Sequence, residues 1–162
     1  MNYDIEILQI LENNSKISHE EVATMIGIDV ETVKKTIDKL TEQGIILSYD
    51  TTINWEKTDV EIVQALIEVK VAPQRSNGFD KVAERIYKFP EVKDCYLMSG
   101  GFDLTVVVEG KNIKEVALFV SSKLAPIDCV IGTATHFVLK KYKNNGVIFE
   151  KKTKDEREAI FL

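Results

Sequence analysis

The sequence has few of the features that direct a protein into or across a membrane. No run approaches the ~20 apolar residues that a membrane-spanning helix requires. The opening residues, Met-Asn-Tyr-Asp-Ile-Glu, lack the basic region and apolar core of a secretion signal. With a hydrophobic content of 44%, the composition is that of an ordinary soluble globular protein, and we expect it in the cytoplasm.

Cysteine and histidine are equally scarce. Cys95 and Cys129 share no metal-ligand spacing, so we expect reduced core residues rather than a disulfide. His19 and His136 lie far apart in the sequence, without a cluster of Cys or Asp beside them, which argues against a metal site. No Ser-His-Asp or Cys-His arrangement and no glycine-rich phosphate loop is visible, so the sequence predicts neither a cofactor nor an enzyme.

Basic residues are sparse in the N-terminal part of the chain. Residues 1–50 contain four lysines, no arginine and ten acidic residues, a net charge of −6, whereas residues 51–162 carry +1 of the total of −5. A DNA-binding domain normally has a basic surface, because neutralised phosphates supply most of its non-specific affinity. DNA binding by residues 1–50 would therefore rest on few phosphate contacts.

Three amphipathic helices are nevertheless predicted in the first 43 residues, at 4–12, 18–26 and 30–43. Ser18 and Glu21 have the spacing of a capping box at the start of the second helix. Gly27 is expected to end that helix, and Asp29 to cap the third after a short turn. Two helices joined by a short glycine-containing turn are typical of a helix-turn-helix module.

The third helix provides the candidate DNA-contacting face. Val33, Ile37 and Leu40 recur on its apolar side, which leaves the opposite side for the major groove. The candidate DNA-binding residues are Ser18, Val30, Glu31, Lys34, Lys35 and Lys39. In the alternative interpretation this face is merely solvated and held by ion pairs between Glu31 and Lys35 and between Lys34 and Asp38.

A change of hydrophobic period from 3.6 to 2 predicts a second domain. Residues 45–55 are β-like and predict a strand or wing that leads out of the first domain, and residues 56–59 form the boundary. Residues 63–71 alternate as a half-buried strand that Pro73 closes. The elements that follow are a helix at 79–88, strands at 92–98 and 102–109, a helix at 113–124 that opens with a capping box at Asn112 and Glu115, and a strand at 130–141.

The order βαββαβ predicts an α+β, ferredoxin-like domain, a four-stranded antiparallel sheet with both helices on one face. Its other face also carries apolar residues, namely Leu66, Val107, Ala134 and Val138. An exposed apolar patch of this kind favours pairing with a second copy. We therefore divide the chain into a helix-turn-helix domain (1–45), a connecting strand (46–59), an oligomerisation domain (60–142) and a C-terminal extension (143–162).

Several short motifs follow one another along residues 3–141. In the first part these are Asn14-Ser-Lys-Ile-Ser18, Val22-Ala23, Gly27-Ile28 and Leu40-Thr-Glu-Gln-Gly-Ile-Ile46, then a linker from Ile46-Leu-Ser-Tyr49 to Ile53-Asn54. In the second part they are a Gly-x-x-Asp turn, Gly100-Gly-Phe-Asp103, and a Thr-x-Thr strand, Thr133-Ala-Thr135. In this order they resemble the Lrp/AsnC (feast/famine) transcription regulators, whose second domain is called RAM, for regulation of amino-acid metabolism.

The resemblance implies a DNA-binding regulator that dimerises through its RAM sheets, often assembles dimers into octameric rings, and binds an effector, commonly an amino acid, near the Gly-x-x-Asp turn. The candidate effector-binding residues are Met98, Ser99, Gly100, Gly101, Asp103, Thr133 and Thr135. A simpler interpretation is a tight hairpin at residues 99–101 with glycine at positive φ, Asp103 bound to turn amides, and threonines that merely favour a strand.

The chain departs from the family pattern in the third helix. The family's Val-x-x-Arg-Ile reads Val33-Lys-Lys-Thr-Ile37 here, so Thr36 replaces the arginine, and Asp29 replaces the usual serine. We therefore expect DNA binding to require several modules on one oligomer. The alternatives are a ligand-independent architectural DNA-binding protein, an interaction module without DNA binding, and a tetrapyrrole decarboxylase-like enzyme, for which the chain offers only three arginines and, in the second domain, His136 alone.

The C-terminal extension lies outside the resemblance. Its mixed charges indicate a mobile segment, and the apolar residues Ile160, Phe161 and Leu162 are candidates for docking on a neighbour.

Overall fold

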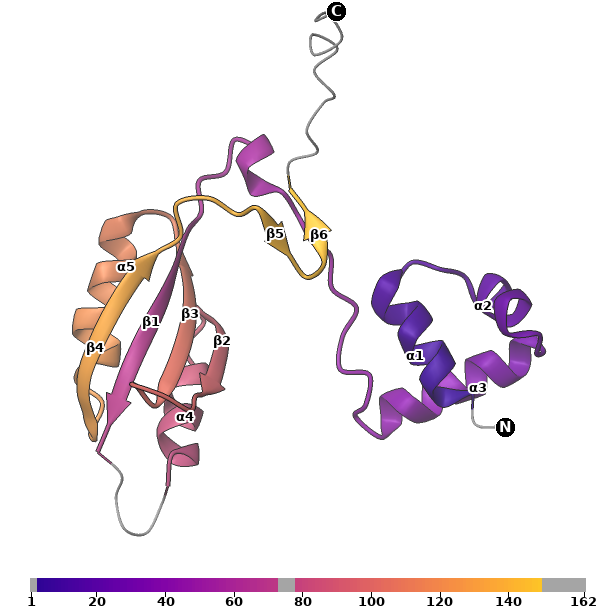
Figure 1. The fold of residues 1–162 in the computed structure, drawn as a ribbon, viewed down its shortest axis with the longest axis horizontal. Coiled ribbons are helices and arrows are strands. Elements are labelled where there is room, and N and C mark those ends of the chain that lie inside the picture. The colour runs from indigo at the N-terminus through magenta and orange to yellow at the C-terminus, as the bar shows by residue number, and fades with distance from the viewer. Residues whose placement is uncertain (1–2, 73–77, 150–162) are drawn as a thin grey trace, which may run out of the picture. The chain divides into compact units, whose positions relative to one another are not determined.

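The computed structural model describes residues 3–72 and 78–149 and divides the chain into two compact units, Met1–Thr52 and Ile53–Leu162 (Figure 1). Pro73, expected to close a strand, and residues 150–162, which hold most of the predicted extension, lie outside the described residues. Within the described part of the chain, no helix is both long enough and apolar enough to cross a membrane.

The first unit consists of three helices, α1 (Asp4–Asn13), α2 (His19–Ile26) and α3 (Val30–Glu42), as the sequence predicts. Ile7 of α1, Val22 of α2 and Val33 of α3 are fully buried and meet in one small core. Because each helix contributes only one apolar stripe, none of the three has a second surface to bury, and the faces opposite the core are exposed.

Local hydrogen bonds fix the ends of α2 and α3. The Ser18 hydroxyl accepts a hydrogen bond from the Glu21 amide at 3.2 Å, and the Glu21 carboxylate accepts one from the Ser18 amide at 2.9 Å, which confirms the capping box. Gly27 ends α2 with a φ of +78°, and Asp29 caps α3 through the Thr32 amide at 2.8 Å. The short turn between α2 and α3 is thus defined by sequence-local chemistry.

The strand or wing predicted at residues 45–55 is wrong. After α3 the described chain bends and then runs without strand pairing to η1, a single 3₁₀ turn at Trp55–Lys57. Leu47 is 88% exposed in this segment. β-branched residues favour a strand only where a neighbouring strand can complete the backbone hydrogen bonds, and these residues have no such neighbour among the described residues.

The second unit has the predicted βαββαβ order. Its elements are β1 (Val63–Val71), α4 (Asp80–Tyr87), β2 (Val92–Leu97), β3 (Leu104–Gly110), α5 (Ile113–Phe119), the π-helical turn η2 (Val120–Leu124) and β4 (Val130–Phe137). The strands form one antiparallel sheet in the order β2-β3-β1-β4. This confirms the ferredoxin-like α+β fold.

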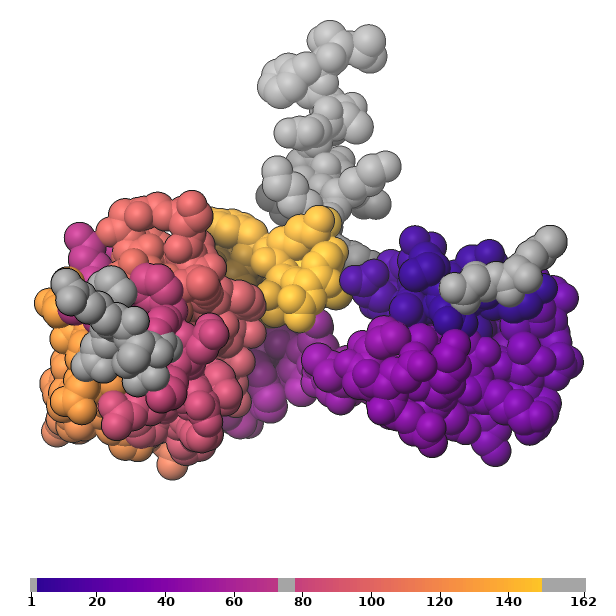
Figure 2. All heavy atoms as spheres, turned by 90° about the horizontal axis from the view of Figure 1, so that it is seen from below, coloured from indigo at the N-terminus to yellow at the C-terminus, as the bar shows by residue number. Residues whose placement is uncertain are grey.

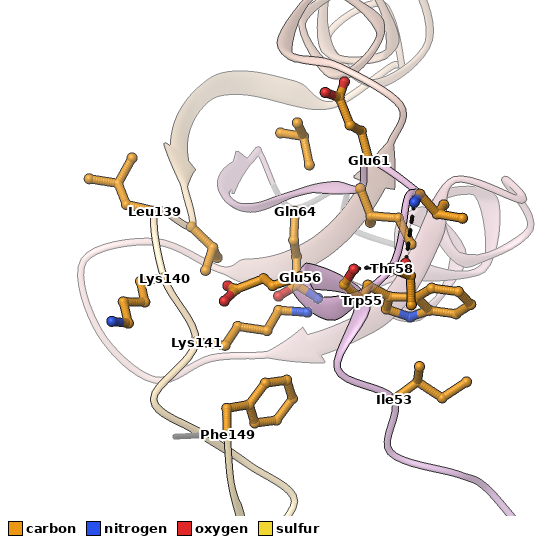
Figure 3. A pocket seen from close by; sticks show the side chains of 14 residues that line it. Ile53, Trp55, Glu56, Thr58, Glu61, Gln64, Leu139, Lys140, Lys141 and Phe149 are labelled. Atoms are coloured by element: carbon orange, nitrogen blue, oxygen red, sulfur yellow. Dashed lines mark hydrogen bonds between the residues drawn. The ribbon is translucent and has the colours of Figure 1, made fainter. Parts of the chain in front are cut away.

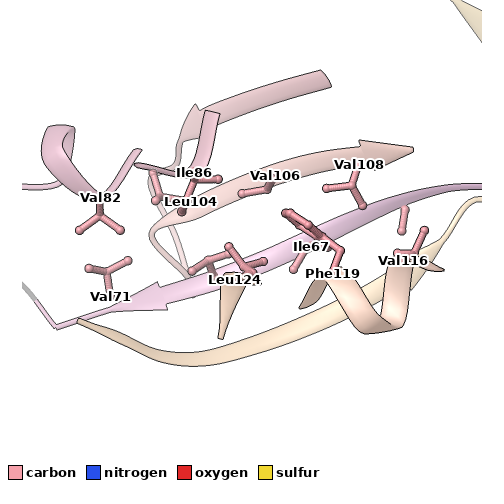
Figure 4. Close-up of a cluster of buried hydrophobic side chains, with 12 residues drawn as sticks. Ile67, Val71, Val82, Ile86, Leu104, Val106, Val108, Val116, Phe119 and Leu124 are labelled. Carbon is pink, nitrogen blue, oxygen red and sulfur yellow. The ribbon is translucent and has the colours of Figure 1, made fainter. Parts of the chain in front are cut away.

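The core of the second unit lies between the sheet and its helices (Figure 4). Ala65, Ile67, Val69 and Val71 of β1 are buried, as the alternating pattern predicts, and they pack with residues from β3, α4 and α5. The helices therefore cover one face of the sheet, and the face that carries Leu66 remains open.

Two details of α5 differ from the prediction. The helix predicted at 113–124 is α-helical only as far as Phe119, after which a π turn begins. Ile113 is 58% exposed, and Phe119 is buried, edge to face with Phe89 at 5.6 Å. The π turn that follows α5 has a different residue period, so one helical phase cannot describe both segments. The capping box at Asn112 is only half formed: its side chain accepts from the Glu115 amide, but the Glu115 carboxylate accepts from Lys111.

The last strand ends at Phe137 rather than at 141, and a small hairpin follows, β5 (Lys143–Asn144) and β6 (Val147–Ile148). Asn145 and Gly146 join the two strands with φ values of +45° and +78°. An Asn-Gly pair favours this kind of turn, so the sequence contains a local signal for the hairpin.

Candidate nucleic-acid interface and effector site

The first two turns of α3 carry four of the six candidate DNA-binding residues, and a fifth, Lys39, lies in its last turn. Glu31, Lys34 and Lys35 are exposed, and Val30 at the start of the helix is 38% exposed. In the space-filling view, the purple segment that contains α3 takes up much of the visible surface of the first unit (Figure 2). The turn fixed by Gly27 and the Asp29 cap therefore presents the first two turns of α3 to solvent.

The ion pairs expected under the alternative interpretation form only in part. Lys35 Nζ lies 3.6 Å from Glu31 Oε1, with both side chains about 70% exposed. Lys34 makes no ion pair with Asp38 or with any other described residue. Exposed pairs of this kind stabilise a helix by only ~0.3–0.5 kcal/mol, so neither lysine is held strongly away from a ligand.

The other two candidates have partners within the unit. Lys39 Nζ donates a hydrogen bond at 3.2 Å to the carboxylate of Asp4, which connects α3 to α1. The Ser18 hydroxyl is the acceptor of the α2 cap, which leaves its own proton for an external acceptor. Lys39 and Ser18 thus support the helices, and their side chains are less available than those of Lys34 and Lys35.

Thr36 and Asp29 determine the charge of this surface. The Thr36 hydroxyl donates to the Thr32 carbonyl at 2.8 Å on a half-buried side chain, so no cation stands where the family has arginine. Hydrogen bonds from Thr32 lower the pKa of Asp29, and those from Ser18 lower the pKa of Glu21. Both carboxylates are therefore ionised at neutral pH, which opposes the approach of phosphate.

The predicted effector turn is a six-residue loop, 98–103, rather than a tight hairpin. The Met98 amide donates to the Asp103 carbonyl at 2.8 Å, and the Asp103 amide donates to the Val69 carbonyl at 3.0 Å. Asp103 Oδ2 accepts a hydrogen bond at 2.8 Å from the Val71 amide of β1, rather than from amides of the turn itself. Asp103 therefore attaches the loop to the end of β1.

Of the two loop glycines, only Gly100 has a positive φ, at +158°. Residues 98 to 101 are exposed, and Met98 is 42% exposed. No described residue donates a hydrogen bond to Asp103 Oδ1. The loop thus offers exposed backbone groups and one carboxylate oxygen to a ligand.

Thr133 and Thr135 lie on β4, on the opposite side of β1 from the loop. Thr133 pairs with Val69 and Thr135 with Ile67, so Thr133 and Asp103 flank the same β1 residue. With strands ~4.8 Å apart, the loop and Thr133 are about 10 Å apart across the sheet. The structure therefore brings the loop residues and Thr133 to one end of the sheet, whereas Thr135 lies opposite Ile67 in the middle of β1.

The open sheet face is partly apolar. Leu66 is 41% exposed and pairs directly with Val107 on one side and His136 on the other. Polar groups lie beside it, since His136 Nε2 is 3.3 Å from Glu68 Oε1. This surface combines an apolar centre with hydrogen-bonding groups at its border, as interfaces between protein subunits do.

A cavity of about 480 Å³, which the sequence did not predict, opens in the second unit (Figure 3). Its lining comes from η1 and the residues around it, from the start of β1, from residues 138–141 and from Phe149. The side chains shown there include Ile53, Trp55 and Leu139. These segments are far apart in the sequence, which explains why local patterns gave no indication of the cavity.

The cysteines and acids of the described residues offer little to a metal ion. No group of three or more His, Cys, Asp or Glu side chains in residues 3–72 and 78–149 is placed to hold one. Cys95 and Cys129 are both free and half-buried, and burial raises the pKa of the Cys95 thiol.

Comparison with known proteins adds information on both units. Residues 2–46 match the family model described as winged helix-turn-helix DNA-binding, and residues 64–148 match that of the Lrp/AsnC ligand binding domain. The chain is 51% identical to a Bacillus subtilis protein named as the uncharacterized HTH-type transcriptional regulator YugG, over 97% of this chain and 95% of that protein.

Two more distant similarities are to proteins whose names mention an amino acid. The chain is 24% identical to the leucine-responsive regulatory protein of Haemophilus influenzae, over 90% of this chain and 87% of that protein. It also resembles the solved structure of a transcriptional regulator from Neisseria meningitidis in complex with L-Met, with a TM-score of 0.70 and 23% identity, over 89% of this chain and 92% of that one. The second likeness concerns the fold.

Proposed function

This chain belongs to the Lrp/AsnC family of HTH-type transcriptional regulators, and we propose that it works as a homo-oligomer whose DNA binding responds to an amino acid or a related small metabolite. Membership confirms the resemblance, and with it the role of a DNA-binding transcriptional regulator. The chain is a DNA-binding transcriptional regulator and not an enzyme, so a tetrapyrrole decarboxylase-like activity is dropped. We also propose that the protein is located in the cytoplasm, where it meets its DNA partner.

The observation that carries the DNA-binding part is the exposed start of α3. A recognition helix contacts base edges through its first turns, which here present Val30, Glu31, Lys34 and Lys35. Lys34 and Lys35 supply the positive charge, whereas Lys39 and Ser18, which have partners in the unit, contribute at the border of the contact with phosphate. This assignment gives each module only a few phosphate contacts.

Oligomerisation compensates for these few contacts. Two or more modules on one particle bind DNA with an effective concentration that a single module lacks. The open sheet face around Leu66 supports a dimer, because its apolar centre would otherwise remain in water. Assembly of dimers into an octamer would place further modules on the same DNA.

The effector part rests on the loop 98–103. Its exposed backbone groups can bind the charged ends of an amino acid, and Asp103 Oδ1 can accept from an ammonium group. Thr133 lies at the same end of the sheet, and Thr135 is two residues further along β4. Because the loop is exposed, a neighbouring copy would have to supply the second wall, which couples ligand binding to assembly. The relatives named for leucine and found with L-Met support an amino acid as the ligand class.

Calorimetry of the full chain against each of the twenty amino acids tests the effector part. A binding amino acid should also change the sedimentation coefficient and the affinity for promoter DNA. If the chain binds DNA and none of the twenty compounds binds or changes assembly, the ligand-independent architectural protein is the better description. If the purified oligomer binds no DNA at low salt, an interaction module without DNA binding is the better description.

A further inference from the structure

The cavity in the second unit is lined in part by the last described residue of the chain. Phe149, the last described residue, lines the cavity together with segments that begin at Ile53 and end at Lys141 (Figure 3). The sequence continues for thirteen further residues, 150–162.

The walls of the cavity expose apolar side chains to water. Ile53 is 43% exposed, Trp55 37%, Val60 51% and Leu139 95%. Polar residues such as Glu56 and Lys141 lie among them. A concave surface that combines exposed apolar side chains with polar groups is a common form of binding site, here for a ligand with an apolar part.

Residues 150–162 consist of a charged stretch followed by one group of apolar residues. Eight of the nine residues from Glu150 to Glu158 are charged, with both signs present, so this stretch favours water. Ala159 is followed by Ile160, Phe161 and Leu162, three large apolar residues in succession. Sites of ~300–1,000 Å³ hold compact apolar ligands, and the cavity of about 480 Å³ has room for side chains from this group.

We propose that the cavity is the docking site for the apolar residues Ile160, Phe161 and Leu162 of the same chain. Ten residues, 150–159, lie between Phe149 and Ile160. Such a segment spans at most ~40 Å when extended and, as a flexible linker, about 18 Å on average. A turn back to the cavity is therefore within reach, and the short tether gives an effective concentration on the order of millimolar. This favours the chain's own residues over the same residues of a second copy.

The only tryptophan of the sequence, Trp55, lines the cavity and reports on its occupancy. The experiment compares the intact chain with Phe161→Ser, and uses Lys154→Ser in the charged stretch as the matched control. Loss of docking exposes the indole, so Trp55 emission shifts to longer wavelength and acrylamide quenching rises in Phe161→Ser, whereas Lys154→Ser behaves as the intact chain. A peptide of residues 150–162 added to the Phe161→Ser protein should reverse the change saturably.

Leu139→Glu disrupts the same contact from the cavity side. Because Leu139 is 95% exposed, the variant is expected to fold, which circular dichroism checks, and to give the same red shift. Combining it with Phe161→Ser should add nothing further. Identical emission and quenching of the intact chain and Phe161→Ser would overturn the proposal. Protection of Trp55 that disappears on dilution would assign the cavity to a second copy, and would overturn the same-chain assignment.

Discussion

The carboxylate of Asp103 accepts a hydrogen bond from the backbone amide of Val71 at 2.8 Å. The Asp103 amide in turn donates to the Val69 carbonyl at 3.0 Å. Asp103 therefore extends the hydrogen bonding between β3 and β1 beyond the first residue of β3. Val71 is 4% exposed, and its amide depends on this acceptor. The aspartate of the Gly-x-x-Asp turn is thus first a structural residue, and ligand binding is proposed for its remaining oxygen.

Asp103→Ala should therefore destabilise the second unit in the absence of any ligand. A buried amide left without an acceptor costs ~1–3 kcal/mol of unfolding free energy. Asp103→Asn keeps a carbonyl oxygen for Val71 and should lose less, while it removes the charge proposed to meet an ammonium group. Denaturant unfolding followed by Trp55 fluorescence measures the first effect, and amino-acid calorimetry the second. Equal destabilisation by both substitutions would contradict the anchoring role.

This hydrogen bond illustrates which part of the fold the sequence could predict. Ser18 with Glu21 and Asp29 with Thr32 are three residues apart, so their contacts follow from helix geometry alone. Asp103 and Val71 are separated by 32 residues and meet only because β3 and β1 pair in one particular register. Alternation predicted which face of β1 is buried, but because side chains alternate with a period of two, it does not distinguish registers that differ by two residues.

The same distinction applies to the candidate sites. The exposed face of α3 followed from helical period, whereas the attachment of Lys39 to Asp4 of α1 required the packing of two helices. The effector residues were found through motif resemblance, which preserves residues brought together by the fold. The cavity beside Trp55 is formed by segments some 80 residues apart, and no motif marked it.

Leu66→Glu is expected to weaken self-association, because Leu66 lies at the centre of the open sheet face between Val107 and His136. A carboxylate buried in an interface without a partner costs several kcal/mol, so the dimer dissociation constant should rise by more than about tenfold. Analytical ultracentrifugation measures it. Leu118→Glu is the matched control, since Leu118 is 54% exposed on α5 and belongs to a helix over the other face. An equal loss of self-association in both variants would mean that the open sheet face is not part of the dimer interface.

Leu66→Glu should also lower DNA affinity, although the substitution is in the unit that holds the sheet and not in the one that holds α3. The reason is that each module alone makes few phosphate contacts and relies on a second module on the same particle. Fluorescence anisotropy with a labelled promoter fragment measures the affinity over a range of protein concentrations. Unchanged affinity in a variant shown to be monomeric would mean that one module suffices.

Lys34→Ala and Lys39→Ala should differ in their effect on DNA binding. Lys34 is exposed and has no ion-pair partner among the described residues, whereas Lys39 is held by Asp4 at 3.2 Å. The logarithm of DNA affinity falls linearly with the logarithm of salt concentration, and each lost phosphate contact makes this slope shallower by about 0.9. We expect this change per module for Lys34→Ala and a smaller one for Lys39→Ala, measured by anisotropy titrations at several salt concentrations. The reverse order would indicate that α3 meets DNA through its later turns.

The Asp29 cap predicts a pH dependence of the first unit. Hydrogen bonds from Thr32 lower the pKa of Asp29 in the folded protein below its value in the unfolded chain, about 3.9. A lowered folded pKa means that the stabilisation is complete above the unfolded pKa and is lost as pH falls through the folded pKa. The first unit should therefore be most stable at neutral pH with respect to this group, and should lose stability progressively below about pH 4.

Asp29→Asn isolates this effect, because asparagine caps a helix about as well as aspartate but does not titrate. Glu21, whose pKa is also lowered by Ser18, titrates in both proteins, so its contribution cancels in the difference. Thermal unfolding followed by circular dichroism, from neutral pH to about pH 3, should give an intact chain at least as stable as the variant at neutral pH. The difference between them should shrink or reverse as Asp29 becomes protonated. A difference that is constant with pH would mean that the charge of Asp29 does not contribute to the cap.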